Sequence, residues 1–142
     1  MGDMVETFRH AKMYARHFDL CNIQSIAVAI LIELNVPTKR VGFEYLKKSI
    51  ILFCEDPTQT ITKEIYCQVG NSLSERTHWR TVERNIRYTI DVAWENKDDR
   101  IWKIYFPINK DGEIVKPSNA EFISMIGYFI QLLNGFISEV DK

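Results

Sequence analysis

The sequence has few cysteines, no long hydrophobic run and little excess charge of either sign. Its three cysteines, Cys21, Cys54 and Cys67, are far apart, and none belongs to a Cys-x-x-Cys pair. An odd number of widely spaced cysteines argues against a disulfide framework and is typical of reduced thiols in the cytoplasm. We therefore expect a cytoplasmic protein whose cysteines are small buried hydrophobic side chains.

No stretch of the chain is apolar enough to cross a membrane. The longest apolar run, Ile26–Ile32, is seven residues long, whereas a membrane-spanning helix needs about twenty. The first residues lack the basic region and the following apolar run of a signal peptide. The Ser or Thr of the myristoylation pattern that would follow Gly2 is also missing. We expect no membrane partner.

Motifs of catalysis and of cofactor binding are missing too. The sequence contains no Walker loop, no Gly-x-Gly-x-x-Gly, no His-Glu-x-x-His and no Gly-x-Ser-x-Gly. Cys67 and His78 are close in sequence, but no third group that would orient them can be identified. His10 and His17 lie seven residues apart, whereas a two-histidine metal site usually has i,i+4 spacing with acidic or sulfur partners. We expect no enzymatic activity, no cofactor and no metal.

Composition and patterning together predict the fold class. The 46% of hydrophobic residues, 26% of charged residues and net charge of −1 are ordinary for a soluble globular protein. Because a stand-alone DNA-binding domain is often basic, this balance counts mildly against a nucleic-acid partner. No linker or repeat interrupts the chain. We expect one all-α domain, a compact bundle of about six helices over residues 23–138, after an N-terminal extension over residues 1–22 that forms one extra helix.

Three helices are predicted before the central region. The second, over residues 23–34, begins at Asn22 or Ser25 and ends before Pro37. The third, over residues 41–55, is equally apolar, and we expect both to form the scaffold of the core. The first helix has the weakest sequence pattern. We expect it to be a docking or oligomerisation helix, with one side lined by Val5, Phe8, Lys12, Ala15 and Phe18.

The C-terminal third predicts a short helix, a hairpin and a long helix. Residues 100–106 read as a short helix packed under the preceding one, and the Asp111-Gly112 turn predicts a hairpin or wing. Ser118 and Glu121 form a capping box that opens the last helix, and Gly135 marks its expected end. Its buried stripe is predicted to be Phe122, Met125, Ile126, Phe129 and Leu133, and two phosphate candidates on the hairpin are Lys110 and Lys116.

The stretch from Thr62 to Trp94 has the sequence pattern of a helix-turn-helix. A short helix over residues 62–69 is followed by a turn and by a longer helix over residues 78–94, for which Thr77 or Ser74 is the expected N-cap. On a helical wheel, the longer helix has an apolar face made of Val82, Ile86, Thr89, Ile90 and Ala93. The opposite face carries Arg80, Arg84, Arg87 and Asp91, with Glu83 and Tyr88 on its flanks.

This arginine face suits DNA, because planar guanidinium groups bond bidentately to phosphates and to the O6/N7 edge of guanine. We expect Arg84 and Arg87 to read guanine edges, and Glu83 to accept from cytosine N4 or to orient an arginine. Arg80 and Thr77 would bond phosphate. The alternative is a solvated helix face on which Glu83 and Arg87 form an ordinary i,i+4 pair.

Several stretches are similar to the C-terminal DNA-binding effector domain of the stage-zero sporulation response regulator of endospore-forming bacteria. Two of them together are quite specific, Val-Glu-Arg-x-Ile-Arg…Val-Ala-Trp within 82–94 and Lys-Pro-Ser-Asn-x-Glu-Phe over 116–122. The resemblance runs from about Ile26 to Leu133, and its other stretches are Glu33–Pro37, Gly42–Ile50, Ile61–Lys63 with Tyr66, and the continuation to Met125.

The resemblance implies a six-helix bundle with a helix-turn-helix, sequence-specific binding of double-stranded DNA and transcriptional control. It also implies base contacts from Glu83, Arg84 and Arg87, the face that the wheel selects independently. Tyr88 stands where the family usually has histidine, and we expect it to touch phosphate or a thymine methyl. The family protein carries a phosphoacceptor receiver domain and this sequence contains none, so we expect a switch other than phosphorylation.

Two functions therefore remain in competition. The first is a DNA-binding transcription regulator, with a homodimer on DNA as a possible form. The second is a protein-interaction module that uses the same fold to bind RNA polymerase or a full-length regulator without reading DNA. The overall charge balance and the added N-terminal helix favour the second, and the arginine face favours the first.

Overall fold

A computed structural model describes residues 4–17 and 22–140 of the chain, without the side chains of residues 17 and 136–140. These residues form an all-α bundle, which confirms the predicted fold class. The elements are α1 (Met4–His17), α2 (Ile23–Glu33), α3 (Val41–Glu55), the short π-helical segment η1 (Ile61–Ile65), α4 (Tyr66–Ser72), α5 (Trp79–Glu95), α6 (Asp99–Tyr105) and α7 (Asn119–Val140).

The scaffold helices α2 and α3 lie close to their predicted positions. The Asn22 side chain caps α2 by accepting a hydrogen bond from the Ser25 backbone N–H at 3.1 Å. Asn35, which has a positive φ of 61°, turns the chain after α2, and α3 spans the predicted residues. The two helices pack against each other.

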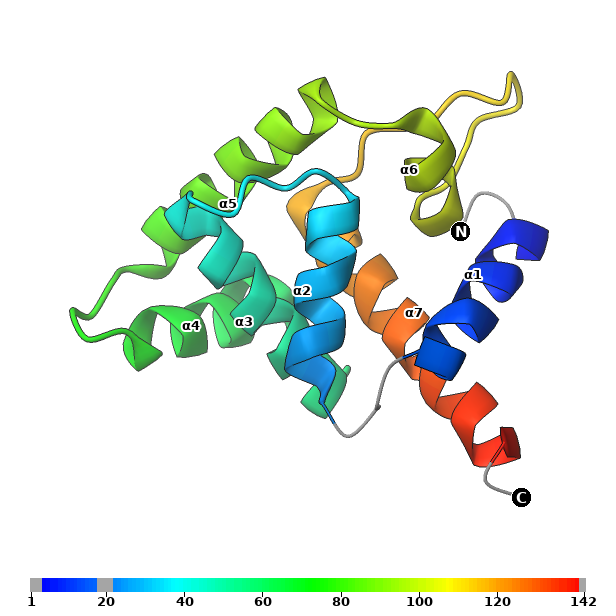
Figure 1. Cartoon of the computed structure of the whole chain (residues 1–142). Coiled ribbons are helices and arrows are strands. Elements are labelled where there is room, and N and C mark those ends of the chain that lie inside the picture. Colours follow the sequence, from blue (N-terminus) through cyan, green and yellow to red (C-terminus); the bar gives the residue numbers. More distant parts are fainter. Residues whose placement is uncertain (1–3, 18–21, 141–142) are drawn as a thin grey trace.

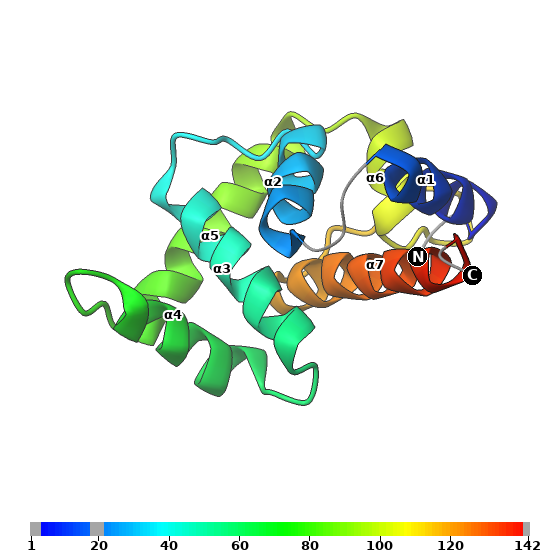
Figure 2. The ribbon, with the colours of Figure 1, turned by 60° about the horizontal axis from the view of Figure 1, so that its bottom comes forward.

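The core lies where α3 passes between α5 and α7 (Figures 1 and 2). Each helix contributes one apolar stripe to it, and the fully or nearly fully buried members include Leu46, Ile50, Phe53, Val82, Ile86, Ile90, Phe122, Ile126 and Phe129. Gly42 lets α3 approach α5 closely, because a Cβ at this position would lie 2.6 Å from the Asn85 carbonyl oxygen. Helix α5 is therefore held directly against the scaffold.

Helix α6 and the following turn form close to where they were predicted, but α6 packs mainly on α1 and α7 and meets α5 through the Trp94–Trp102 ring contact. Asp98 caps α6, and Trp102 is fully buried with its indole N–H donating to the Leu34 carbonyl at 3.1 Å. Beyond α6, Ile108 and Ile114 form an isolated antiparallel bridge, closed by a turn in which Gly112 has a φ of 78°. Because only glycine adopts this left-handed conformation readily, the Asp-Gly pair marked the turn correctly.

The long helix α7 opens with the predicted capping box. The Glu121 backbone N–H donates to the Ser118 hydroxyl at 3.1 Å, and the Ser118 N–H donates to the Glu121 carboxylate at 3.3 Å. The expected end at Gly135 is wrong, since α7 continues to Val140. One glycine costs a helix only about 1 kcal/mol, and no proline follows to stop it. Met125 is only half-buried, in contrast to its neighbours on the predicted stripe.

Helix α1 lies beside α7 and α6, at the opposite end of the molecule from α4 (Figures 1 and 2). It docks on the bundle, which is one of the two predicted alternatives. However, the side of the helix that faces inward differs from the predicted one. Val5 and Phe8 are 67% and 39% exposed, whereas the buried residues are Thr7, Ala11 and Tyr14. Phe18, also expected on this side, lies outside the described residues, as does Cys21.

A half-buried carboxylate explains the orientation of α1. Glu33, at the end of α2, accepts hydrogen bonds from the hydroxyls of Tyr14 and Tyr105, each at 2.7 Å. His10 Nε2 lies 2.6 Å from the other carboxylate oxygen, and the two form an ion pair whenever the imidazole is protonated. Thr7 donates to the Ile104 carbonyl. These polar contacts outweigh the apolar side chains of Val5 and Phe8.

In the described ranges, no helix is long and apolar enough to span a membrane.

Candidate nucleic-acid interface

Helices α4 and α5, with the turn between them, have the order and packing expected of a helix-turn-helix. The first predicted helix is in fact composite, because the π-helical η1 leads into α4. The turn over residues 73–78 is closed by the Thr77 backbone N–H, which donates to the Gly70 carbonyl at 3.1 Å. Helix α4 packs against α5, so that the turn and the start of α5 extend away from the core (Figure 2).

The N-cap of α5 is His78, so the prediction of Thr77 or Ser74 is wrong. His78 Nδ1 accepts the Arg80 backbone N–H at 3.1 Å, whereas the Thr77 hydroxyl donates to the Glu75 carbonyl at 3.1 Å. An accepting Nδ1 places the ring proton of the neutral imidazole on Nε2. Histidine is not among the preferred N-cap residues, so no local pattern identifies this role.

The buried face of α5 is the one that the helical wheel predicted. Val82, Ile86, Thr89, Ile90 and Ala93 are all buried, with exposed fractions of 0–2%. This face packs on α3 and α4, which positions the opposite face of the helix toward solvent. The prediction that valine and isoleucine anchor the helix is confirmed.

The opposite face presents Arg80, Arg84, Arg87 and Tyr88 to solvent. Among the residues that the structure describes, Arg84 has no carboxylate within ion-pair distance. Arg80 lies with its guanidinium carbon 5.3 Å from the centre of the Trp79 ring, in cation–π geometry. The Arg87 side chain, 56% exposed, pairs with Glu83 at 2.8 Å. Thus three of the predicted site residues are exposed cations, and a fourth, Tyr88, is 53% exposed beside them.

Glu83 and Thr77 differ from these four. The Glu83 side chain is only 28% exposed and lies on the flank of α5, where it pairs with Arg87. Thr77 is half-buried in the turn, with its hydroxyl already engaged. The structure therefore brings Arg80, Arg84 and Arg87 onto one face with Tyr88, and leaves Thr77 at its edge.

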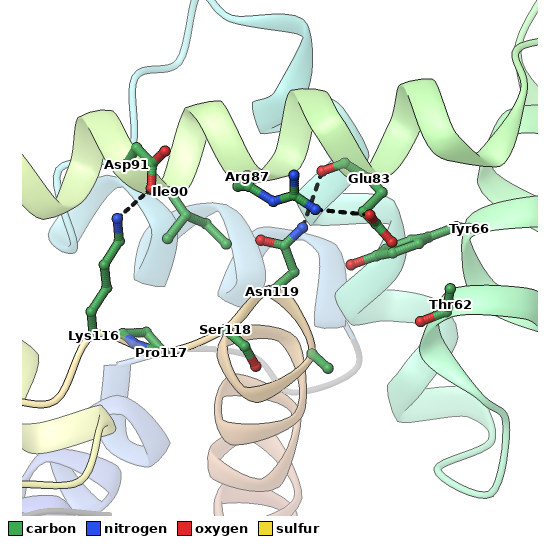
Figure 3. Close-up of a pocket in the computed structure, with 11 residues that line it drawn as sticks. Thr62, Tyr66, Glu83, Arg87, Ile90, Asp91, Lys116, Pro117, Ser118 and Asn119 are labelled. Carbon is green, nitrogen blue, oxygen red and sulfur yellow. Dashed lines mark hydrogen bonds and ion pairs between the residues drawn. The ribbon is translucent and has the colours of Figure 1, made fainter.

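A hollow lies along the flank of α5, between that helix and the N-terminus of α7 (Figure 3). Its α5 side carries Glu83, Arg87 and Asp91, and its other sides are formed by Thr62, Tyr66 and the segment from Lys116 to Ala120. The Asn119 amide donates to the Glu83 backbone carbonyl at 3.0 Å, and the Lys116 ammonium donates to the Asp91 carboxylate. Sequence patterns did not identify Tyr66 and Asn119 as site residues.

Lys116 was expected on the hairpin as a phosphate candidate. It instead follows the hairpin and reaches α5, where it pairs with Asp91. Lys110 is exposed on the hairpin itself.

The two cysteines that the structure describes do not line the hollow along α5. Burial raises the pKa of the Cys54 thiol to about 11, and the nearby Glu55 carboxylate adds to this. Cys54 and Cys67 are both half-buried and free. In the described part of the chain, no three His, Cys, Asp or Glu side chains are placed to hold a metal ion. The side chain of His17, the partner considered for His10, lies outside that part.

A comparison with known proteins identifies the family. The family model described as sporulation initiation factor Spo0A C terminal matches residues 27–130. The chain belongs to this family. The match extends from α2 into α7 and includes the whole of the interface described above, whereas α1 lies before it. The Spo0A C-terminal family consists of DNA-binding effector domains of a sporulation regulator, and it is not a family of enzymes.

Proposed function

We propose that this protein regulates transcription by sequence-specific binding of double-stranded DNA, with the exposed face of α5 in the major groove. The observation that carries the proposal is the division of α5 into a buried apolar face and a face with Arg80, Arg84 and Arg87. A helix anchored in this way can enter the groove without exposing the core. Membership of the Spo0A C-terminal family supports the same function.

The side chains divide between base reading and phosphate binding. Arg84 and Arg87 read guanine edges, because both project from the middle of the exposed face. Glu83 orients Arg87, a role supported by their 2.8 Å contact, or accepts from cytosine N4. Arg80 and Thr77, near the start of α5, bond phosphates, and Tyr88 contacts a phosphate or a thymine methyl.

The Glu83–Arg87 pair is compatible with this function. An exposed i,i+4 pair contributes only about 0.3–0.5 kcal/mol. Arg87 uses one nitrogen in the contact, and its other N–H groups remain available to a ligand. Breaking or sharing this pair on a duplex therefore costs little compared with a bidentate contact to guanine, worth about 1–3 kcal/mol.

Selection of bound duplexes from a random pool tests the proposal, with the wild-type chain and the Arg84→Ala variant. We expect the wild type to enrich one sequence and Arg84→Ala to lose preference at one base position, by about 1–3 kcal/mol. Arg9→Ala is the matched control, because Arg9 is an exposed helix arginine in an i,i+3 pair with Glu6, on α1. Equal wild-type affinity for the selected and a scrambled duplex would refute sequence-specific reading.

A protein-interaction module is the second candidate. Helix α1 precedes the family match and exposes Met4 and Val5, which favours a surface for RNA polymerase or for a full-length regulator. Partner binding that persists at about 0.1–0.3 M salt, with no DNA binding at low salt, would favour this function.

We also propose how the chain is divided and where it acts. Residues 1–22 form an extension and residues 23–138 form the effector domain, which acts in the cytoplasm and binds DNA as a homodimer. The start of the family match at residue 27 supports the division.

A further inference from the structure

The Tyr66 hydroxyl is a buried polar group without a partner. Tyr66 is 1% exposed, and none of the described residues lies in hydrogen-bond geometry with its hydroxyl, although the nearby Asn119 amide acts to lower its pKa. It points into the hollow between α5 and the N-terminus of α7 (Figure 3). Burial raises the pKa of Tyr66 to about 12, so the phenol keeps its proton at neutral pH and is a hydrogen-bond donor. A buried donor without an acceptor suggests that a ligand supplies one.

The other groups around the hollow are also mainly donors. The α7 helix begins here, and no hydrogen bond from the backbone N–H groups of Asn119 or Ala120 is found among the described residues. Arg87 and Lys116 each use one nitrogen on a carboxylate of the same wall and keep further N–H groups. Since Glu83 and Asp91 are both neutralised by these cations, the positive end of the α7 dipole leaves the hollow favourable to an anion.

We propose that this hollow binds a phosphate group, with the Tyr66 hydroxyl, the α7 amides and the Arg87 side chain as donors. A phosphate offers several acceptor oxygens in a tetrahedral arrangement, which suits donors from three separate elements. Arg87 keeps its contact with Glu83 through one nitrogen and offers its remaining N–H groups to the anion.

The position of the hollow indicates a source for the phosphate. Arg87 belongs both to the hollow and to the exposed face of α5, so a duplex seated on that face brings its backbone alongside. This step rests on the proposed DNA binding. A free phosphate or a phosphorylated small molecule offers the same chemistry, and the experiment separates the two.

Tyr66→Phe is the test variant, because it removes one hydroxyl and no charge. The unpartnered hydroxyl contributes no bond to the fold, so we expect an unchanged or higher melting temperature. Tyr128→Phe is the matched control, since Tyr128 also lies against the core through Phe53 but is 48% exposed on α7 and outside the hollow. One arm titrates each protein with inorganic phosphate by NMR, and the other measures affinity for the duplex recovered by selection.

Loss of about tenfold in either affinity with Tyr66→Phe, and not with Tyr128→Phe, supports the site. A loss confined to the duplex, and abolished when one neutral methylphosphonate replaces the contacted phosphate, identifies the DNA backbone. A loss confined to inorganic phosphate identifies a free anion. Unchanged affinities in both arms overturn the proposal, as does a wild type that binds neither ligand. If wild type binds no duplex but its phosphate affinity depends on Tyr66, only the DNA function fails.

Discussion

Glu83 and Glu33 each contact a basic side chain, but their partners differ in exposure. Glu83 lies on the flank of α5 beside Arg87, whose side chain is 56% exposed. Glu33 lies where α1, α2 and α6 meet, with the hydroxyls of Tyr14 and Tyr105 bonded to the same carboxylate oxygen. One carboxylate therefore belongs to a surface that can exchange partners, and the other to a junction that cannot.

The difference follows from the burial of the partners, because the Glu83 and Glu33 side chains are themselves 28% and 19% exposed. At the surface, water screens the Glu83–Arg87 attraction and competes for both groups, so that the pair contributes little to stability. At the junction, removal of Glu33 would leave buried hydroxyls without an acceptor, and each unsatisfied group costs about 1–3 kcal/mol. The exposed face of α5 can therefore vary with little effect on folding, whereas the junction at Glu33 holds α1 to the rest of the bundle.

The largest effect is expected from Glu33→Ala. This change orphans the hydroxyls of Tyr14 and Tyr105 and removes the partner of His10, so we expect a loss of about 3 kcal/mol in the free energy of unfolding. Urea denaturation followed by circular dichroism measures it. Glu44→Ala is the control, because the Glu44 side chain is 51% exposed and its ion pair with Lys47 lies within α3. Equal losses for the two variants would show that the junction carries no special stability.

The second effect is on binding alone. Arg87→Ala should weaken binding to the selected duplex by about 1–3 kcal/mol and lower the salt slope by about one. The free energy of unfolding should change by less than about 0.5 kcal/mol, because Arg87 is exposed. Arg9→Ala removes a similar exposed arginine from α1 and should leave both quantities unchanged. A reduced duplex affinity in Arg9→Ala would extend the DNA-binding surface to α1.

The third effect is a pH dependence of the junction. Burial alone would raise the pKa of Glu33, but the contacts from His10, Tyr14 and Tyr105 outweigh it and hold the pKa below 4.5, the ordinary value. A carboxyl with a lowered folded-state pKa stabilises the protein above its unfolded pKa, and this stabilisation is lost as the pH falls through the lower folded pKa. We expect Glu33→Gln to flatten the stability profile below about pH 4.5. If Glu33→Gln loses stability at acid pH as steeply as the wild type, Glu33 is not responsible for this pH dependence.

The smallest effect is expected from Glu83→Gln. The substitution keeps the shape of the side chain and the backbone carbonyl that Asn119 binds, so the free energy of unfolding should change by no more than about 0.5 kcal/mol. Thermal unfolding measures this change. A loss as large as that of Glu33→Ala would make the two carboxylates equivalent and remove the contrast.

Sequence patterns predicted the faces of α5 because a helix on the outside of a bundle must bury a stripe with a period near 3.6 residues. The apolar face from Val82 to Ala93 obeys this rule, and the arginines follow from it by exclusion. The limits of α3 and the capping box at Ser118 were predicted for similar reasons, since the signals are local.

The failures involve contacts between distant segments. The inward side of α1 is set by Glu33, nineteen or more residues away along the chain, and not by the apolar side chains of α1 itself. The Lys116–Asp91 pair and the place of Tyr66 in the hollow likewise depend on how α7 meets α5. The His78 cap is local, but its residue type gave no signal.

The close approach at Gly42 has a consequence for redesign. The Thr89 side chain and the Asn85 carbonyl of α5 lie directly against Gly42 of α3, so a methyl group there would force the two helices apart and tilt the arginines as a set. The direction in which the arginine face of α5 points is therefore set by Gly42, which lies on the opposite, buried side of that helix. An engineer who wishes to change the recognised sequence should vary positions 84 and 87 and keep that glycine untouched.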